Sequence, residues 1–221
     1  GLTFGINNNG GITVSGPISG SDANNSIIIK DGTGAGKLIF SSANTYAGTT
    51  SITSGVMQVQ NSTALGASGS DGTTVGTGAA LEISGATLSI PEGITLNGTG
   101  ISSGGAIRNI LGTNALSGTI SLTSASRINV DAGTLSMTSS GTSIALDINT
   151  LNAGVASGTS MYVSGALTGA GDFTKDSTGT LYVSGYNTGY GGSITVYKGV
   201  MNIQNSNALG TTNVATTVLN S

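Results

Sequence analysis

The sequence contains no cysteine, histidine or tryptophan, and only 7% of its residues are charged, against roughly 25% in an average soluble protein. Without thiolates and imidazoles, the chain lacks the ordinary ligands for zinc, copper, haem and iron–sulfur clusters. It also lacks a thiolate nucleophile and an imidazole base. We therefore expect no cofactor and no metal site, and only carboxylates, hydroxyls and lysines remain as reactive groups.

Clustered positive charge and long apolar runs are also missing. The net charge is −3, and the six basic residues are scattered singly, whereas a nucleic-acid surface needs grouped cations to neutralise phosphates. We therefore expect no nucleic-acid partner. The longest aliphatic run, Ile27 to Ile29, is far too short to span a bilayer. Any export signal or membrane anchor is expected outside this segment.

Alternation of apolar and polar residues fills the chain, and no segment shows the 3.6-residue period of a helix. The runs KLIF, ALEIS, RINV and TLSM, for example, place apolar residues two positions apart. Clusters of Gly, Asn, Ser and Asp separate these runs and supply the positive φ values that tight turns need. The sequence therefore predicts an all-β protein.

Repeats at two lengths favour a solenoid over an antiparallel sandwich. MYVSG at 161–165 and LYVSG at 181–185 lie one solenoid turn apart. At a longer scale, residues 30–66 align with residues 175–210, and GVMQVQNSTALG at 55–66 returns as GVMNIQNSNALG at 199–210. In a parallel β-helix each coil lies on the previous one, so like residues stack in ladders. We predict a single right-handed parallel β-helix over residues 1–221, with about 9 to 11 coils.

The aligned copies also predict which residues face inward and which form corners. Met57 and Met201 occupy equivalent inward positions. In the alignment, Asn44 corresponds to Asn187 and Asn61 corresponds to Asn205, and all four are expected at the bends that every coil has to make. Asn61 and Asn205 begin the segment that closes each copy.

The segment GTGAGKLIFSSANTYAGTTSITSGVMQVQNSTALG, at 32–66, resembles the autotransporter-associated β-strand repeat. Repeats of this family read like a Gly-Thr-Leu-x-Leu-Ser-Gly strand, an Ala-Asn-x-Tyr-x-Gly turn, a Thr-rich strand and an Asn-x-x-Ala-Leu-Gly close. The copy at 175–210 is similar, and residues 96–137 look like the segments between such repeats in very large bacterial surface proteins.

The resemblance implies a passenger region that is displayed on the cell surface of a Gram-negative bacterium or secreted by it. It implies a right-handed β-helix carried across the outer membrane by a separate C-terminal barrel, which this segment does not contain and which would be its only link to the membrane. The family's repeats have no catalytic residues to transfer. The absence of cysteine agrees with a passenger that crosses the membrane unfolded.

Two glycine-rich motifs have alternative chemical interpretations. GTGAGK at 32–37 is similar to a phosphate-binding loop, but Asp31 and Leu38 stand where that loop needs Gly and a magnesium-binding Ser or Thr. A glycine-rich turn is the prediction. TGAGDFTKD at 168–176 is similar to a calcium-binding nonapeptide. Asp172 and Asp176 lack tandem copies, which favours a solvated turn over a metal site.

Parallel β-helices also include polysaccharide lyases and hydrolases, which use two or three carboxylates on neighbouring coils. Asp31 and Asp176 occupy equivalent repeat positions, each after a lysine, a pattern typical of repeated turn structure. Glu82 and Glu92 lie ten residues apart. Because tryptophan, which commonly stacks on sugars, is also missing, we expect no enzymatic activity and no catalytic residue.

Tyrosines form the candidate binding surface. If Leu181 and Val183 face inward, Tyr182 faces outward. The same alternation places Tyr162 and Tyr197 outside, with Tyr186 and Tyr190 in the turn between. Tyr162 and Tyr182, one coil apart, are expected to stack. A cross-coil ladder that stiffens the sheet is favoured over a patch that binds a glycan or cell-surface partner.

The sequence thus predicts a structural or adhesive extracellular module, with a polysaccharide-binding or polysaccharide-cleaving β-helix as the alternative. Neither end of the sequence has a charged residue or a proline within eleven residues, although soluble proteins usually protect open strand edges with such residues. We therefore expect end-to-end self-association or continuation into neighbouring repeats, as part of a larger protein or a stacking fibre.

Overall fold

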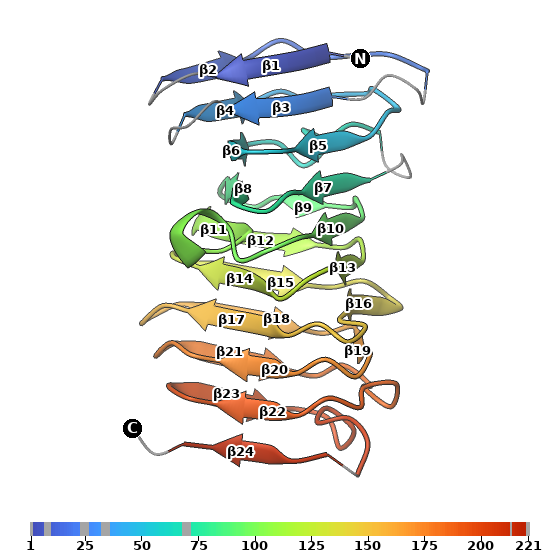
Figure 1. The fold of residues 1–221 in the computed structure, drawn as a ribbon, viewed down its shortest axis with the longest axis vertical. Helices are drawn as coiled ribbons and strands as arrows, with labels where there is room; N and C mark the ends of the chain where they lie inside the picture. Colours follow the sequence, from blue (N-terminus) through green and yellow to red (C-terminus); the bar gives the residue numbers. More distant parts are fainter. Residues whose placement is uncertain are drawn as a thin grey trace.

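The strands stack along one long axis with the two ends of the chain at opposite ends of the stack (Figure 1). The computed structural model describes residues 2–6, 10–22, 27–31, 36–67, 72–212 and 214–219, with backbone but not side chains at residues 6 and 27–31. Neighbouring strands pair in parallel throughout the stack. The predicted parallel β-helix is confirmed as a stack of parallel strands that forms a β-solenoid.

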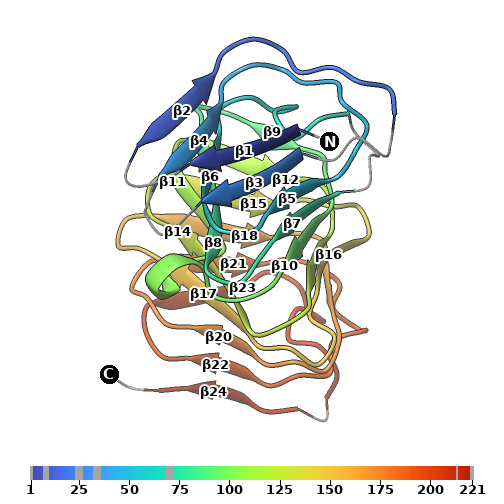
Figure 2. The same ribbon diagram turned by 45° about the horizontal axis from the view of Figure 1, so that its top comes forward.

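Three sheets form the faces of the solenoid (Figure 2). The first sheet contains β1 (Leu2–Ile6), β3 (Ile27–Asp31), β5 (Thr50–Ile52), β7 (Thr73–Val75), β10 (Ile94–Leu96), β13 (Ile120–Leu122), β16 (Thr142–Ala145) and β19 (Ala166–Thr168). The second contains β2 (Gly11–Val14), β4 (Lys37–Phe40), β6 (Gly55–Val59), β8 (Ala79–Ser84), β11 (Ile107–Leu111), β14 (Ser126–Val130), β17 (Leu151–Val155), β20 (Phe173–Lys175), β22 (Ile194–Val196) and β24 (Thr216–Val218). The third contains β9 (Ser89–Ile90), β12 (Thr113–Leu116), β15 (Thr134–Met137), β18 (Ser160–Val163), β21 (Thr180–Val183) and β23 (Val200–Ile203).

The number of coils depends on the face. The second sheet has ten strands, but the first has eight and the third has six, so the stack makes about eight turns, fewer than the 9 to 11 predicted. The difference arises because the third sheet begins only at β9 and the first sheet ends at β19. In the remaining coils, the described residues form no regular strand on these faces.

Inward side chains build one continuous core along the axis. In β4 and β21 the burial alternates residue by residue, as the period-two pattern predicts. Strand register then stacks the inward residues of the second sheet into one ladder, made by Leu38, Met57, Leu81, Ile107 and Ile128. Met201, expected to face inward, is partly buried and packs against the same core.

Asparagine side chains join the coils at corners, as the aligned copies predict. The Asn44 Oδ1 atom accepts a hydrogen bond from the Ile18 backbone nitrogen at 2.8 Å, and its Nδ2 atom donates to the Ala64 carbonyl oxygen at 2.6 Å. One buried side chain thus connects the coil before it with the coil after it. Asn61 has a local role, because its Oδ1 atom accepts the Thr63 backbone N–H at 3.0 Å.

Helical structure in the described residues is limited to the 3-10 turn η1 (Ile101–Ser103), between β10 and β11. Ser102 and Ser103 there have φ values of 49° and 57°. The turn projects beside the second sheet, where Figure 2 shows it in green. No helix in the described part of the chain is long and apolar enough to cross a membrane.

Candidate functional site

The outer surface of the third sheet has the expected tyrosine stack. Ser160 to Val163 pair in register with Thr180 to Val183, which places Tyr162 opposite Tyr182. Their ring centroids lie 4.4 Å apart with an interplanar angle of 5°. Both side chains are half-buried. The predicted stack is confirmed, and its rings cover one another's faces.

The other three tyrosines differ in exposure. Tyr186 is 63% exposed and Tyr197 is also exposed, as expected. Tyr190 is completely buried, so its assignment to a binding surface is wrong. Its hydroxyl donates a hydrogen bond to the Ser193 carbonyl oxygen at 2.9 Å, and burial raises the pKa of that hydroxyl above its ordinary value. Tyr190 occupies the position of Tyr46 in the first copy, which is buried in the same way.

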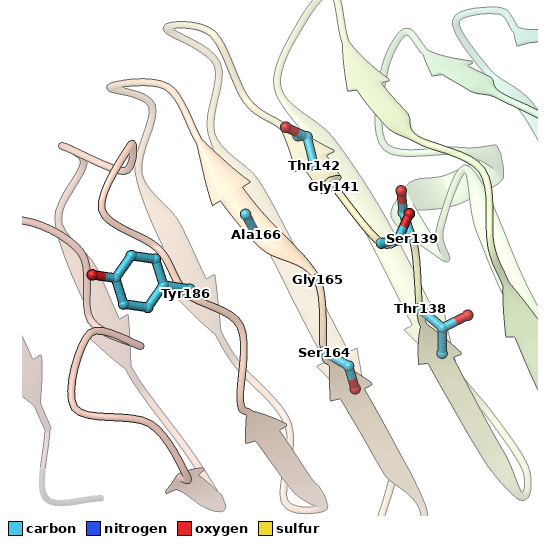
Figure 3. A pocket seen from close by; sticks show the side chains of 9 residues that line it. Thr138, Ser139, Gly141, Thr142, Ser164, Gly165, Ala166 and Tyr186 are labelled. Carbon is cyan, nitrogen blue, oxygen red and sulfur yellow. The ribbon is translucent and has the colours of Figure 1, made fainter.

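Tyr186 borders a groove of about 500 Å³. Figure 3 shows Tyr186 on one coil, Ser164 to Ala166 on the next, and Thr138 to Thr142 on the coil beyond. The groove therefore crosses three successive coils, just after the ends of strands β21, β18 and β15. No charged side chain lines it; its polar side chains are hydroxyls, and glycine and alanine complete the lining. We call this surface the Tyr186 groove.

A second pocket, of about 340 Å³, lies outside the second sheet beside η1. Its carboxylate, Glu82, is only 3% exposed and accepts hydrogen bonds from Lys37 Nζ at 2.7 Å and Arg108 Nη1 at 3.2 Å. Arg108 Nε also donates to Asp131 Oδ2 at 2.9 Å. We call this the charged pocket. Because these charged side chains pair with one another across four strands, their ion pairs connect neighbouring coils.

The repeated Lys-Asp pair does not form a simple turn in the second copy. Lys175 is buried within the core ladder, and its Nζ atom donates to the carbonyl oxygens of Ser177 and, at 2.9 Å, Lys198. Burial lowers the pKa of Lys175, an effect that the Asp176 charge partly opposes. The equivalent side chains in the first copy, at residues 30 and 31, lie outside the described residues.

Asp176 binds Arg127 through two hydrogen bonds, one of them from Nη2 at 3.0 Å. Burial alone would raise its pKa, but hydrogen bonds from Arg127 and Ser177 and the nearby positive charges lower the pKa overall. Asp172 accepts a bond from the Ser193 backbone nitrogen at 3.1 Å. In the described ranges, no three side chains of the types that ligate metals lie together. The segment similar to a phosphate loop lies mostly outside these ranges.

Glu92 has different surroundings from Glu82. It is buried near β7 and β10 and accepts a hydrogen bond from Thr73 Oγ1 at 2.9 Å. Thr73 pairs with Thr50 on β5, whose Oγ1 atom is hydrogen-bonded to the Tyr46 hydroxyl at 2.6 Å. Burial raises the Glu92 pKa from 4.5 to about 7, although the Thr73 bond opposes this change. No sequence pattern indicated this buried acid, because a lone Glu after Pro indicates a turn.

Two segments of the chain, residues 33–59 and 173–203, match the family model of the passenger-associated-transport-repeat. They overlap the two copies identified at 30–66 and 175–210, so the expected resemblance to a passenger repeat is confirmed. No curated protein and no solved structure matches the chain significantly. The repeat and the β-solenoid together fit an extracellular passenger module.

Proposed function

We propose that the chain is the shaft of an adhesive or matrix-building passenger, displayed on the surface of a Gram-negative bacterium or secreted by it. The observation that carries this proposal is the unbroken stack: each coil is bonded to the next by backbone ladders, and buried Asn side chains connect coils at corners. Pulling along the axis loads these bonds in every coil. A rod of this kind holds a binding surface away from the cell.

Mechanical unfolding tests the shaft role directly. The chain has no cysteine, so Ser15→Cys and Thr212→Cys, both at exposed positions, provide unique handles near the two ends. Coils of 19 residues (Lys37 to Val56) to 26 residues (Leu81 to Ile107) should unfold in steps of about 60 to 90 Å each. Extension without resolved force steps would contradict the proposal. Antibody labelling of intact cells that express the parent protein tests the surface location.

We further propose that the module does not cleave polysaccharides. Within the described residues, Glu82 is the carboxylate of the charged pocket and no acid lines the Tyr186 groove. Glycosidases place two carboxylates on either side of the bond they break. Incubation with neutral and acidic polysaccharides should therefore release no new reducing ends and no unsaturated products. Release above a boiled-protein control would overturn this proposal.

We also propose that the last coil, in which β23 and β24 are the end strands of their sheets, is covered by another solenoid coil. Val200, Ile203, Val218 and Leu219 are exposed on this coil, and a strand edge with apolar side chains is a template for further pairing. Concentrated protein should therefore form filaments in light scattering and electron microscopy. A single monomeric species at high concentration would argue against stacking.

A further inference from the structure

A β-bulge lies beneath the Tyr186 groove. On strands β16 and β19, Thr142 pairs with Ala166 and Ile144 pairs with Leu167, so Ser143 is an extra residue without a partner. Both Ser143 and Ile144 are buried, which breaks the in-and-out alternation of the strand. Bulges of this kind redirect one side chain and are over-represented beside functional sites.

The Ser143 hydroxyl is fully buried and has no hydrogen-bond partner among the described residues. An unpaired buried hydroxyl is costly, and each one in a folded protein needs an explanation. A Cβ atom on Gly165 would collide with Ser143 Oγ and with the Ser139 carbonyl oxygen. Gly165 and Ser139 line the groove, so the bulged residue lies directly under its floor, which covers the Ser143 hydroxyl and holds the two coils in close contact.

The remaining walls indicate the chemistry of a ligand. No lining side chain is charged, which disfavours anions and cations alike. Hydroxyls can both donate and accept hydrogen bonds, and the exposed Tyr186 ring provides an apolar plane with a polar tip. The volume of about 500 Å³ falls within the range of roughly 300 to 1,000 Å³ that is usual for small-ligand sites. An uncharged, hydroxyl-rich ring matches each of these features.

We propose that the Tyr186 groove binds a neutral glycan. One sugar ring stacks on Tyr186, above the floor that Gly165 and Ser139 form over the buried Ser143 hydroxyl. The hydroxyls of Thr142 and Ser164 bond the sugar edge. This inference names a ligand for the adhesive passenger proposed above, but the stack itself needs none of these contacts.

The test is calorimetric and saturation-transfer NMR titration with maltohexaose, cellohexaose and xylohexaose as neutral probes, and with oligogalacturonate as the acidic comparison. We expect at least one neutral probe to bind more tightly than the acidic one. Tyr186→Ala should weaken that binding at least tenfold. Ser164→Ala, which removes a hydroxyl from the groove lining, should weaken it severalfold without lowering the melting temperature, because Ser164 is exposed.

Matched controls separate binding from folding. Tyr197→Ala removes another exposed tyrosine outside the groove, and Ser121→Ala removes a hydroxyl on neighbouring strand β13; both should leave affinity unchanged. The proposal is overturned if no neutral probe binds, if the acidic probe binds best, or if Tyr186→Ala or Ser164→Ala leaves affinity intact. Such a failure with unchanged melting and unfolding-force profiles would leave the shaft role standing.

Discussion

The two copies of the passenger repeat fold alike but lie on different faces of the solenoid. Asn187 accepts a hydrogen bond from the Leu167 nitrogen at 2.8 Å and donates to the Ala208 carbonyl at 2.6 Å, the same two bonds as Asn44 in the first copy. Gly66 and Gly210 both have positive φ values and pack against the carbonyl oxygen of the buried corner tyrosine. A side chain there would collide with that oxygen in either copy.

The faces differ because the copies are separated by a fractional number of turns. Strands β4 and β6 of the first copy belong to the second sheet, but their equivalents β21 and β23 belong to the third. From β4 to β20 there are six steps along the second sheet, and β21 lies one face further. The repeat therefore specifies a local path of strand, corner, strand and corner. Equivalent outward residues consequently point to different sides of the shaft.

The corner asparagines offer the largest test of this equivalence. Asn44→Ala and Asn187→Ala each leave one backbone N–H and one carbonyl unpaired in a buried site. At about 1 to 3 kcal/mol for each unpaired group, either change should cost about 2 to 5 kcal/mol of unfolding free energy. Denaturant unfolding measures the total, and hydrogen exchange shows whether the loss is confined to neighbouring coils.

Asn61→Ala and Asn205→Ala are the matched controls, because these side chains accept local hydrogen bonds, from a backbone N–H in each copy and also from the Thr63 hydroxyl in the first. They should cost about 1 kcal/mol or less. The two corners are not equivalent if the losses of unfolding free energy in Asn44→Ala and Asn187→Ala differ from each other by more than they differ from the losses in these controls.

A second test uses a difference between the corners. The hydroxyl of Tyr46 joins the network that ends at buried Glu92, whereas Tyr190 bonds a carbonyl oxygen and lies near the exposed Asp172. Because the Glu92 pKa of about 7 in the fold exceeds its ordinary value of 4.5, the folded state binds more protons between these pH values. Stability from this group is therefore greatest below pH 4.5 and falls as pH rises to about 7.

The rise in the Glu92 pKa from 4.5 to about 7 means that ionisation of Glu92 destabilises the folded state by about 3 kcal/mol. Glu92→Gln should remove that pH dependence and raise the melting temperature at pH 8, with little change at pH 4. In the unmodified chain, hydrogen exchange at pH 8 should be faster around Tyr46 than around Tyr190, relative to pH 5 and after correction for intrinsic rates. Equal pH responses at both corners would show that Glu92 does not control the first one.

Much of the fold follows from the sequence because each coil repeats the same bends. The 20-residue spacing of the two YVSG segments gave the register of β18 with β21 and hence the tyrosine stack. Period-two alternation gave the inward ladder of Leu38 and Met57. These features depend only on near neighbours in the stack, so local patterns are sufficient to specify them.

Less of the candidate site could be predicted from the sequence. Tyr190 has the same Asn-x-Tyr context as Tyr46 after a one-residue insertion at Gly189, yet a turn tyrosine normally suggests exposure; burial follows only from the closed corner. Ser143 is buried only because of a bulge against the next coil, which no alternation pattern reveals. Lys175 in the core is explained by two carbonyl oxygens that its long side chain reaches. Each of these depends on contacts between coils.

The smallest test concerns the outward residues, where the copies differ most. Tyr182 in the second copy corresponds to Ile39 in the first; Tyr182 stacks on Tyr162, while Ile39 pairs with Gln58 on the next strand. A double-mutant cycle with Tyr162→Ala and Tyr182→Ala should give a coupling energy of about 0.5 to 1.5 kcal/mol in denaturant unfolding. A cycle with Ile39→Ala and Gln58→Ala should give less than about 0.5 kcal/mol, because an aliphatic and an amide side chain share no stacked faces. Equal coupling energies in both cycles would mean that the tyrosine stack adds no stability beyond ordinary cross-strand packing. The backbone register alone would then explain how the two tyrosine rings are placed.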